Sequence, residues 1–196
     1  MKRWPMRHFI TVSQELREKR HLPLFVFGPK EAELQATHRE EILAMGGLVY
    51  YSEDSRIQPL AGILRRCDLL VSNDSGIMHL GASAGCRVLA IFGPSVSRVW
   101  FPYSNSRNRV IERDVACRLG CRGGCTEHAC LETILPEEVV SHAISLLETR
   151  PLHRVSPPGR SRGRVLRQFG PELQGGRQQC SSPVSAACEQ GRHADR

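Results

Sequence analysis

The sequence predicts an α/β fold for residues 1–150, in which helices flank a Rossmann-like parallel sheet. Short apolar runs alternate with longer segments whose apolar residues recur every three or four positions. Two of the runs, LFVF at 24–27 and VLAIF at 88–92, are apolar at every position, as in strands that are buried on both faces. Strands of this kind in alternation with helices are typical of a parallel sheet covered by helices.

Turn and capping residues mark the ends of the elements. Pro5 suits the first turn of a helix that ends near Arg20, and its inner face carries Phe9, Val12 and Leu16. Gly28–Pro29 stops the first strand, and Gly46–Gly47 stops the next helix. In chain order we expect helices at 5–20, 30–45, 58–66, 77–84 and 136–148, and strands at 24–27, 48–50, 68–72 and 88–92.

The 196 residues divide into a body, 1–150, and a basic tail, 151–196. Lys and Arg number 27 against 20 Asp and Glu, which gives a formal net charge of +7. The tail alone holds eight Arg and three acidic residues, together with five Pro and six Gly, so we expect it to be disordered. The body is therefore nearly neutral.

The hydropathy pattern excludes a membrane-spanning helix, because no apolar run approaches the roughly 18 residues that a span needs. The N-terminal segment MKRWPMRHFI lacks the apolar stretch of a signal peptide. We expect a cytoplasmic protein, with a peripheral contact at the inner face of the membrane as an open alternative.

Residues 72–79, SNDSGIMH, connect a predicted strand to a helix and form the strongest candidate binding site. In a parallel sheet, ligands bind beyond the carboxyl ends of the strands. Ser75 suits the N-cap, Gly76 lets a ligand approach the backbone, and the helix start favours a phosphate. His79 lies one turn further on. A capped turn with no ligand is the alternative interpretation. The sequence has no P-loop and no G-x-G-x-x-G.

Four ordered motifs resemble glycosyltransferase family nine, the lipopolysaccharide heptosyltransferases. They are DLLVSNDSGIMHLGASAGCRVLAIFGPS at 68–95, KRWP at 2–5, FGPKEAE at 27–33, and the cysteine-bearing CRLGCRGGC with CLETILPEEV between 117 and 139. The resemblance covers about 1–148. It implies that 1–150 is the C-terminal, nucleotide-sugar-binding half of a GT-B fold, in which two Rossmann-like domains face each other across a cleft.

The resemblance also implies roles for residues. Lys2 would contact the donor diphosphate, Glu31 would bind the ribose hydroxyls with Glu33 as the alternative acid, and Met78 would pack near the base. The phosphates and sugar would be surrounded by Asp74, Ser75, Gly76 and His79. The implied donor is an ADP-sugar such as ADP-heptose, and the acceptor is a lipopolysaccharide core bound by an N-terminal domain. No catalytic base is assigned in this chain and no cofactor is expected. We therefore expect a truncated fragment that is inactive alone.

The cysteines and the tail leave alternatives open. Cys117, Cys121, Cys125 and Cys130 have spacings that zinc permits, yet reduced thiols are the expectation in a cytoplasm. Cys67 and Cys86 are expected to be packing residues. A non-catalytic nucleotide-sugar-binding module is the alternative function. Nucleic-acid binding through the tail is a third hypothesis, and we expect no specific nucleic-acid partner.

Overall fold

The structure is a computed structural model that describes residues 3–54, 56–102, 107–117, 125 and 128–149, all within the unit Met1–Leu152. The predicted disordered tail, 151–196, lies outside the described residues. The described helices are α1 (Met6–Glu18), η1 (Pro29–Glu31), α2 (Ala32–Ala44), α3 (Ile57–Leu64), α4 (Gly76–Ser83), α5 (Ser97–Trp100), α6 (Ala129–Glu132) and α7 (Pro136–Glu148). The strands are β1 (Leu24–Phe27), β2 (Leu48–Tyr51), β3 (Leu69–Asn73), β4 (Arg87–Phe92) and β5 (Asn108–Glu112).

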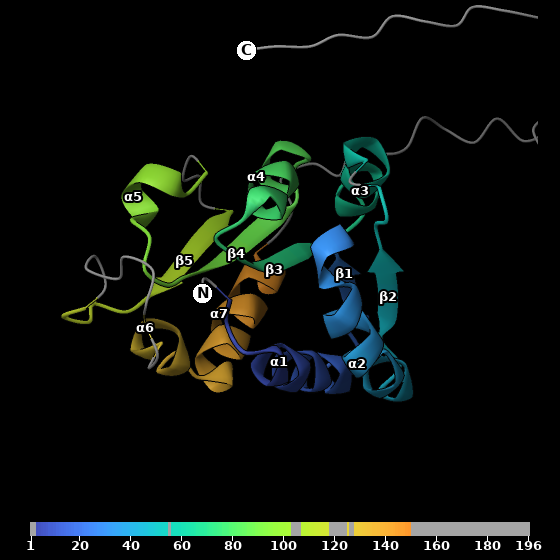
Figure 1. Cartoon of the computed structure of the whole chain (residues 1–196), viewed down its shortest axis with the longest axis horizontal. Coiled ribbons are helices and arrows are strands. Elements are labelled where there is room, and N and C mark those ends of the chain that lie inside the picture. The colour runs from blue at the N-terminus through green and yellow to red at the C-terminus, as the bar shows by residue number, and fades with distance from the viewer. Residues whose placement is uncertain (1–2, 55, 103–106, 118–124, 126–127, 150–196) are drawn as a thin grey trace, which may run out of the picture. The chain divides into compact units, whose positions relative to one another are not determined.

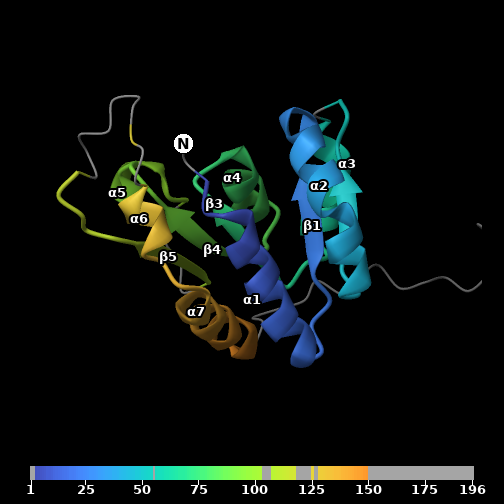
Figure 2. The ribbon, with the colours of Figure 1, turned by 60° about the horizontal axis from the view of Figure 1, so that its bottom comes forward.

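All strand pairs are parallel, and the described strands form two hydrogen-bonded sheets. β1 pairs with β2 in one sheet, and the other has the order β3-β4-β5. Figures 1 and 2 show β1 on the β3 side of the three-stranded sheet, so the order in space is β2, β1, β3, β4, β5. We expected a single sheet. Hydropathy identifies the strands. It does not show whether β1 and β3 lie close enough for backbone hydrogen bonds, because that distance depends on how the helices pack.

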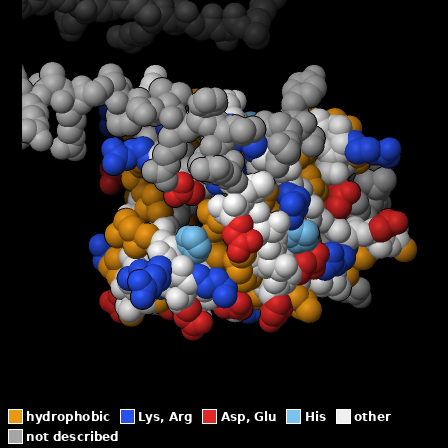
Figure 3. All heavy atoms as spheres, turned by 180° about the vertical axis from the view of Figure 1, so that it is seen from behind, with side chains coloured by type: hydrophobic (Ala, Val, Ile, Leu, Met, Phe, Trp, Pro, Cys, Tyr) orange, Lys and Arg blue, Asp and Glu red, His pale blue; other side chains and the backbone are white. Residues whose placement is uncertain are grey.

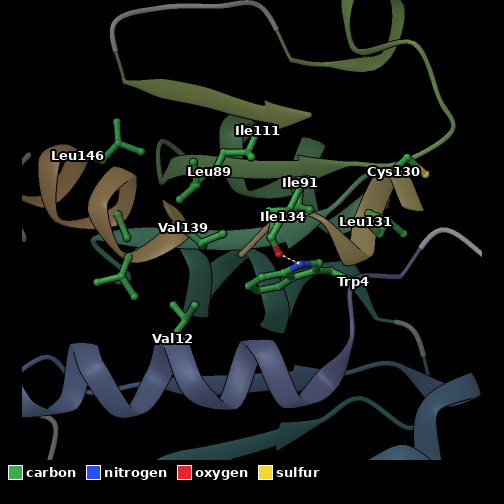
Figure 4. Packing of buried hydrophobic residues seen from close by; sticks show 12 residues of the cluster. Trp4, Val12, Leu89, Ile91, Ile111, Cys130, Leu131, Ile134, Val139 and Leu146 are labelled. Carbon is green, nitrogen blue, oxygen red and sulfur yellow. Dashed lines mark hydrogen bonds between the residues drawn. The ribbon is translucent and has the colours of Figure 1, made fainter. Parts of the chain in front are cut away.

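The core lies on both faces of β4, all six residues of which are buried. Side chains alternate between the faces, so Leu89 and Ile91 pack toward α1 and α7, while Val88, Ala90 and Phe92 pack with Met78 of α4. Figure 1 accordingly shows α6 and α7 on one side of this sheet and α4 on the other. Figure 4 shows the first cluster closing around Trp4, whose indole N–H donates to the Ile134 carbonyl at 3.0 Å.

Most predicted elements are confirmed within a few residues. Gly46 ends α2 as expected: its φ is +77°, which favours glycine, and the N–H of Gly47 bonds back to the Ile42 carbonyl at 2.9 Å. Three elements were missed, namely α5, β5 and α6. Two of them have only four residues, and β5 carries Asn108, Arg109 and Glu112, which hide its apolar centre.

Charges of both signs mix on the surface. On the face seen in Figure 3, basic and acidic side chains are interspersed, in agreement with a nearly neutral body. Among the described residues, no helix is long and apolar enough to cross a membrane.

Candidate nucleotide-binding site

The candidate site lies where the strand order reverses. From β1 the chain steps outward to β2, and it then returns to the other side of β1 to form β3 (Figure 1). In doubly wound sheets, the crevice at the carboxyl ends of two such strands is the ligand site. The loops that leave this end are η1 after β1 and the Asp74–Ser75 turn after β3. Both were selected from the sequence.

The N-terminal segment joins these two loops. The backbone N–H of Trp4 donates to Asn73 Oδ1, at the end of β3, at 2.8 Å. The guanidinium of the adjacent Arg3 pairs with Glu31 Oε1, in η1, at 2.9 Å. Because Arg3 and Trp4 are consecutive, Glu31 and Asn73 are brought to the same end of the fold. Sequence patterns assign no role to Arg3 or Asn73, because their roles depend on contacts between segments that are distant in the chain.

Glu31 is held in place and Glu33 is not. Besides the pair with Arg3, the Glu31 carboxylate accepts the N–H of Gly28 through Oε2 at 2.9 Å. Its side chain is 28% exposed, and a carboxylate has about four acceptor positions, so two stay open to a ligand. Glu33 is exposed in the first turn of α2. The structure therefore favours Glu31 over Glu33 as the preorganised acceptor.

Asp74 is fixed by the loop after β4. Its Oδ2 accepts the Ser95 hydroxyl at 2.5 Å, and its backbone N–H donates to the Ile91 carbonyl at 3.3 Å. Ser95 is buried, at 8% exposure. Sequence reasoning included Ser95 in the quoted motif without assigning it a role, because a serine after a Gly-Pro turn has no chemical signature of its own.

The start of α4 is open. Ser75 occupies the N-cap as predicted, yet no side-chain cap hydrogen bond forms, and its hydroxyl donates instead to the Asn73 carbonyl at 3.3 Å. In the first turn of α4 the N–H of Met78 already donates to the Ser75 carbonyl at 3.1 Å. The amides of Gly76 and Ile77, which precede it, are those that the start of a helix offers to an anion. A Cβ built on Gly76 would meet nothing within 4 Å, so packing within the described fold does not require glycine there. His79 is exposed one turn further along α4.

Two residues of the expected set stand apart. Lys2 lies outside the described residues. Met78 is 0% exposed and packs against Val88, Ala90 and Phe92. In the first turn of α4 its side chain faces the sheet, and its expected place near a base stays a prediction.

The cysteines are placed in two groups. Cys86 is buried and its thiol donates to the Cys67 carbonyl at 3.5 Å; burial raises the pKa of the Cys86 thiol to about 12, which makes it an inert packing residue as predicted. Of the possible zinc ligands, Cys121 lies outside the described residues. Cys130 is in the core, and Cys125 Sγ accepts the His128 N–H at 3.3 Å. The described residues contain no group of three potential metal ligands.

The parallel strands and flanking helices define a Rossmann-like α/β domain, and the candidate site lies at the carboxyl ends of its strands. Residues 1–129 match glycosyltransferase family 9 (heptosyltransferase), and the chain belongs to this family. The solved glycosyltransferase family 9 structure from Veillonella parvula is 28% identical, with a TM-score of 0.61, and the match covers 74% of this chain and 42% of that one. Heptosyltransferase II of Escherichia coli, at 24% identity and a TM-score of 0.59, shares the fold.

Curated relatives are similar over the same region. Lipooligosaccharide heptosyltransferase 2 of Campylobacter jejuni is 29% identical over 153 residues, which are 75% of this chain and 47% of the relative. Lipopolysaccharide heptosyltransferase 2 of Escherichia coli K12 is 26% identical over 153 residues, 74% of this chain and 43% of the relative. The chain thus spans less than half the length of these relatives.

Proposed function

We propose that this chain binds the nucleotide-sugar donor of a heptosyltransferase, with ADP-heptose as the donor and a lipopolysaccharide core as the acceptor. The observation that carries the proposal is the meeting of Glu31 with the open start of α4 at one end of the sheet, through Arg3 and Trp4. The proposed donor follows from family membership and from the names of the relatives.

In the proposed complex the diphosphate lies at the first turn of α4. The amides of that turn and the positive end of the helix dipole offset the phosphate charge. Asp74 and Ser75 shape the turn, and His79 donates to the same anion. Lys2 supplies a cation that stabilises charge on the departing diphosphate. Glu31 accepts the ribose hydroxyls with the acceptor positions that Gly28 and Arg3 leave open.

We further propose that the chain alone binds donor without transferring sugar. Attack by an acceptor hydroxyl needs a carboxylate that takes its proton, and we assign that role to none of the described acids. A cytoplasmic location, with peripheral membrane contact, is part of the same proposal.

Calorimetric titration of the purified chain tests the donor proposal. We expect binding of ADP and ADP-heptose in preference to UDP-sugars, and a loss of affinity of at least about tenfold in Asp74→Ala and His79→Ala, each removing a polar contact. Equal affinity of both variants and the parent would place the site elsewhere. Acceptor-dependent release of ADP by the 196-residue chain would contradict inactivity alone, whereas binding without turnover also fits a non-catalytic nucleotide-sugar module.

A further inference from the structure

The ion pair between Arg3 and Glu31 is the starting point. Arg3 lies just before α1 and Glu31 ends η1, and their side chains are 47% and 28% exposed. The pair therefore faces solvent at the same end of the fold as the open start of α4. A partly exposed ion pair contributes little to the stability of a fold, so stability does not account for its position.

The contacts of Glu31 show what the pair achieves. The N–H of Gly28 fixes Oε2 and the Arg3 guanidinium fixes Oε1, so both carboxylate oxygens are held. The N–H of Gly28 lies in the backbone of the β1 loop, whereas Arg3 is anchored through its neighbour Trp4, which bonds to Asn73 at the end of β3. Glu31 is thus oriented relative to β3 and not only to its own loop.

This relation matters because the described β1–β2 sheet shares no strand hydrogen bonds with the β3–β4–β5 sheet. A ligand that spans the crevice must touch both. Its recognition depends on the spacing between the Glu31 carboxylate and the start of α4, and the segment Arg3–Trp4 links the loops that carry them.

We infer that Arg3 is a positioning residue that fixes the Glu31 carboxylate for the ribose hydroxyls of the donor, an inference that rests on the proposed function. Arg3 acts through Glu31 and makes the site selective for a ribonucleotide. Glu33, two residues further along and exposed, has no such role.

Selectivity for the ribose hydroxyls is the property to measure. ADP and 2′,3′-dideoxy-ADP are titrated into the parent chain and into the variants Arg3→Met, Arg3→Lys, Glu31→Gln and Glu33→Gln. We expect the parent to prefer ADP by about tenfold, the scale of one or two hydrogen bonds. Arg3→Met and Glu31→Gln lose most of that preference, Arg3→Lys recovers part of it, and Glu33→Gln keeps it. Thermal denaturation of each variant reports on the fold.

The outcomes separate the inference from the proposed function. If Arg3→Met weakens both nucleotides by the same factor, Arg3 contacts phosphate and the inference is wrong. If Arg3→Met keeps the preference while Glu31→Gln loses it, Glu31 acts without Arg3 and the inference is again wrong, although the proposed function stands. A parent chain that binds neither nucleotide overturns both. In the double variant Arg3→Met/Glu31→Gln, the preference is expected to be no lower than in Glu31→Gln alone, since the two residues act as a unit.

Discussion

The hydroxyl of Ser95 donates a 2.5 Å hydrogen bond to Oδ2 of Asp74, and this bond ties the loop after β4 to the loop after β3. Ser95 is buried, whereas Asp74 is half-buried and immediately precedes the N-cap of α4. A buried hydroxyl that donates to a carboxylate fixes the orientation of that carboxylate more firmly than water would. The position of the candidate phosphate site therefore depends on a residue 21 positions away in the sequence.

Replacing Ser95 by Ala is expected to weaken ADP binding about five- to tenfold, because Asp74 Oδ2 loses the Ser95 hydroxyl and the turn before α4 loosens. The loss of this hydrogen bond is expected to reduce the free energy of binding by roughly 1 kcal/mol. Isothermal titration with ADP measures the effect. Ser83→Ala, at the exposed end of α4, is the matched control and should bind as the parent does. Unchanged affinity in Ser95→Ala would show that Asp74 needs no support from this loop.

Two glycines with open surroundings give a test of the α4 start. A Cβ on Gly76 or on Gly62 would meet nothing within 4 Å. Both Ala variants are expected to fold. The free energy of unfolding of Gly62→Ala should rise by up to about 1 kcal/mol, because alanine favours the helical conformation of α3 more than glycine does. Only Gly76→Ala should lose nucleotide affinity, by about tenfold or more, because its methyl group occupies the space of the phosphate. Equal nucleotide binding by the two variants would rule out a close approach of the ligand to Gly76.

Trp4→Phe is expected to lower the free energy of unfolding by about 2–3 kcal/mol. The smaller ring leaves unfilled volume in the core, and the Ile134 carbonyl loses the indole donor. Urea denaturation followed by circular dichroism measures the change. The control is Trp100→Phe: Trp100 is 55% exposed, so its replacement should cost no more than about 0.5 kcal/mol. Similar losses in both variants would contradict the central place of Trp4.

The Arg113–Glu138 pair predicts an acid dependence of stability. Glu138 accepts two hydrogen bonds from the Arg113 guanidinium, and these lower the pKa of its carboxyl below the ordinary 4.5. A lowered pKa in the folded state means that the stabilisation is present above about pH 4.5 and is lost as the pH falls through the folded-state value.

Glu138→Gln should therefore reduce stability by about 1 kcal/mol at pH 7, and the difference from the parent should shrink toward zero as the pH falls through the lowered pKa of Glu138. Urea denaturation at a series of pH values checks this. Glu137→Gln removes a carboxylate from the same first turn of α7 and leaves the Arg113–Glu138 pair in place. This control distinguishes the effect of the ion pair from that of a negative charge at the start of the helix. A pH-independent difference between the parent and Glu138→Gln would contradict the assignment to this ion pair.

Local pattern was enough to predict the strands and helices that carry the site. β1 and α7 have the predicted bounds, because a fully apolar run between turn residues and a proline-led amphipathic segment are strong local signals. The turn at Asp74 was identified for the same reason. β5 was missed because Arg109 and Glu112 interrupt its apolar pattern. Charged residues are tolerated there because β5 pairs on one side with β4 and lies at the edge of the described sheet, a position that only the tertiary fold defines.

The residues that were missed at the site depend on long-range contacts. Ser95 and Arg3 gain their importance from Asp74 and Glu31, partners 21 and 28 positions away. Met78 is expected near a base because it lies inside the motif, and the structure adds that its side chain is buried against β4. Motif membership selects a loop, whereas the direction of each side chain depends on packing that a motif does not encode.

The hydrogen bond from Trp4 to Ile134 also sets an order of events during synthesis. The two residues are 130 positions apart, so a ribosome must release Ile134 before the indole can find its acceptor. Trp4 at the same time donates its backbone N–H to Asn73, which borders the candidate site. The indole of Trp4 therefore reaches its acceptor only after residues 1–134 have been synthesised, so the core around Trp4 is completed late in the synthesis of the body.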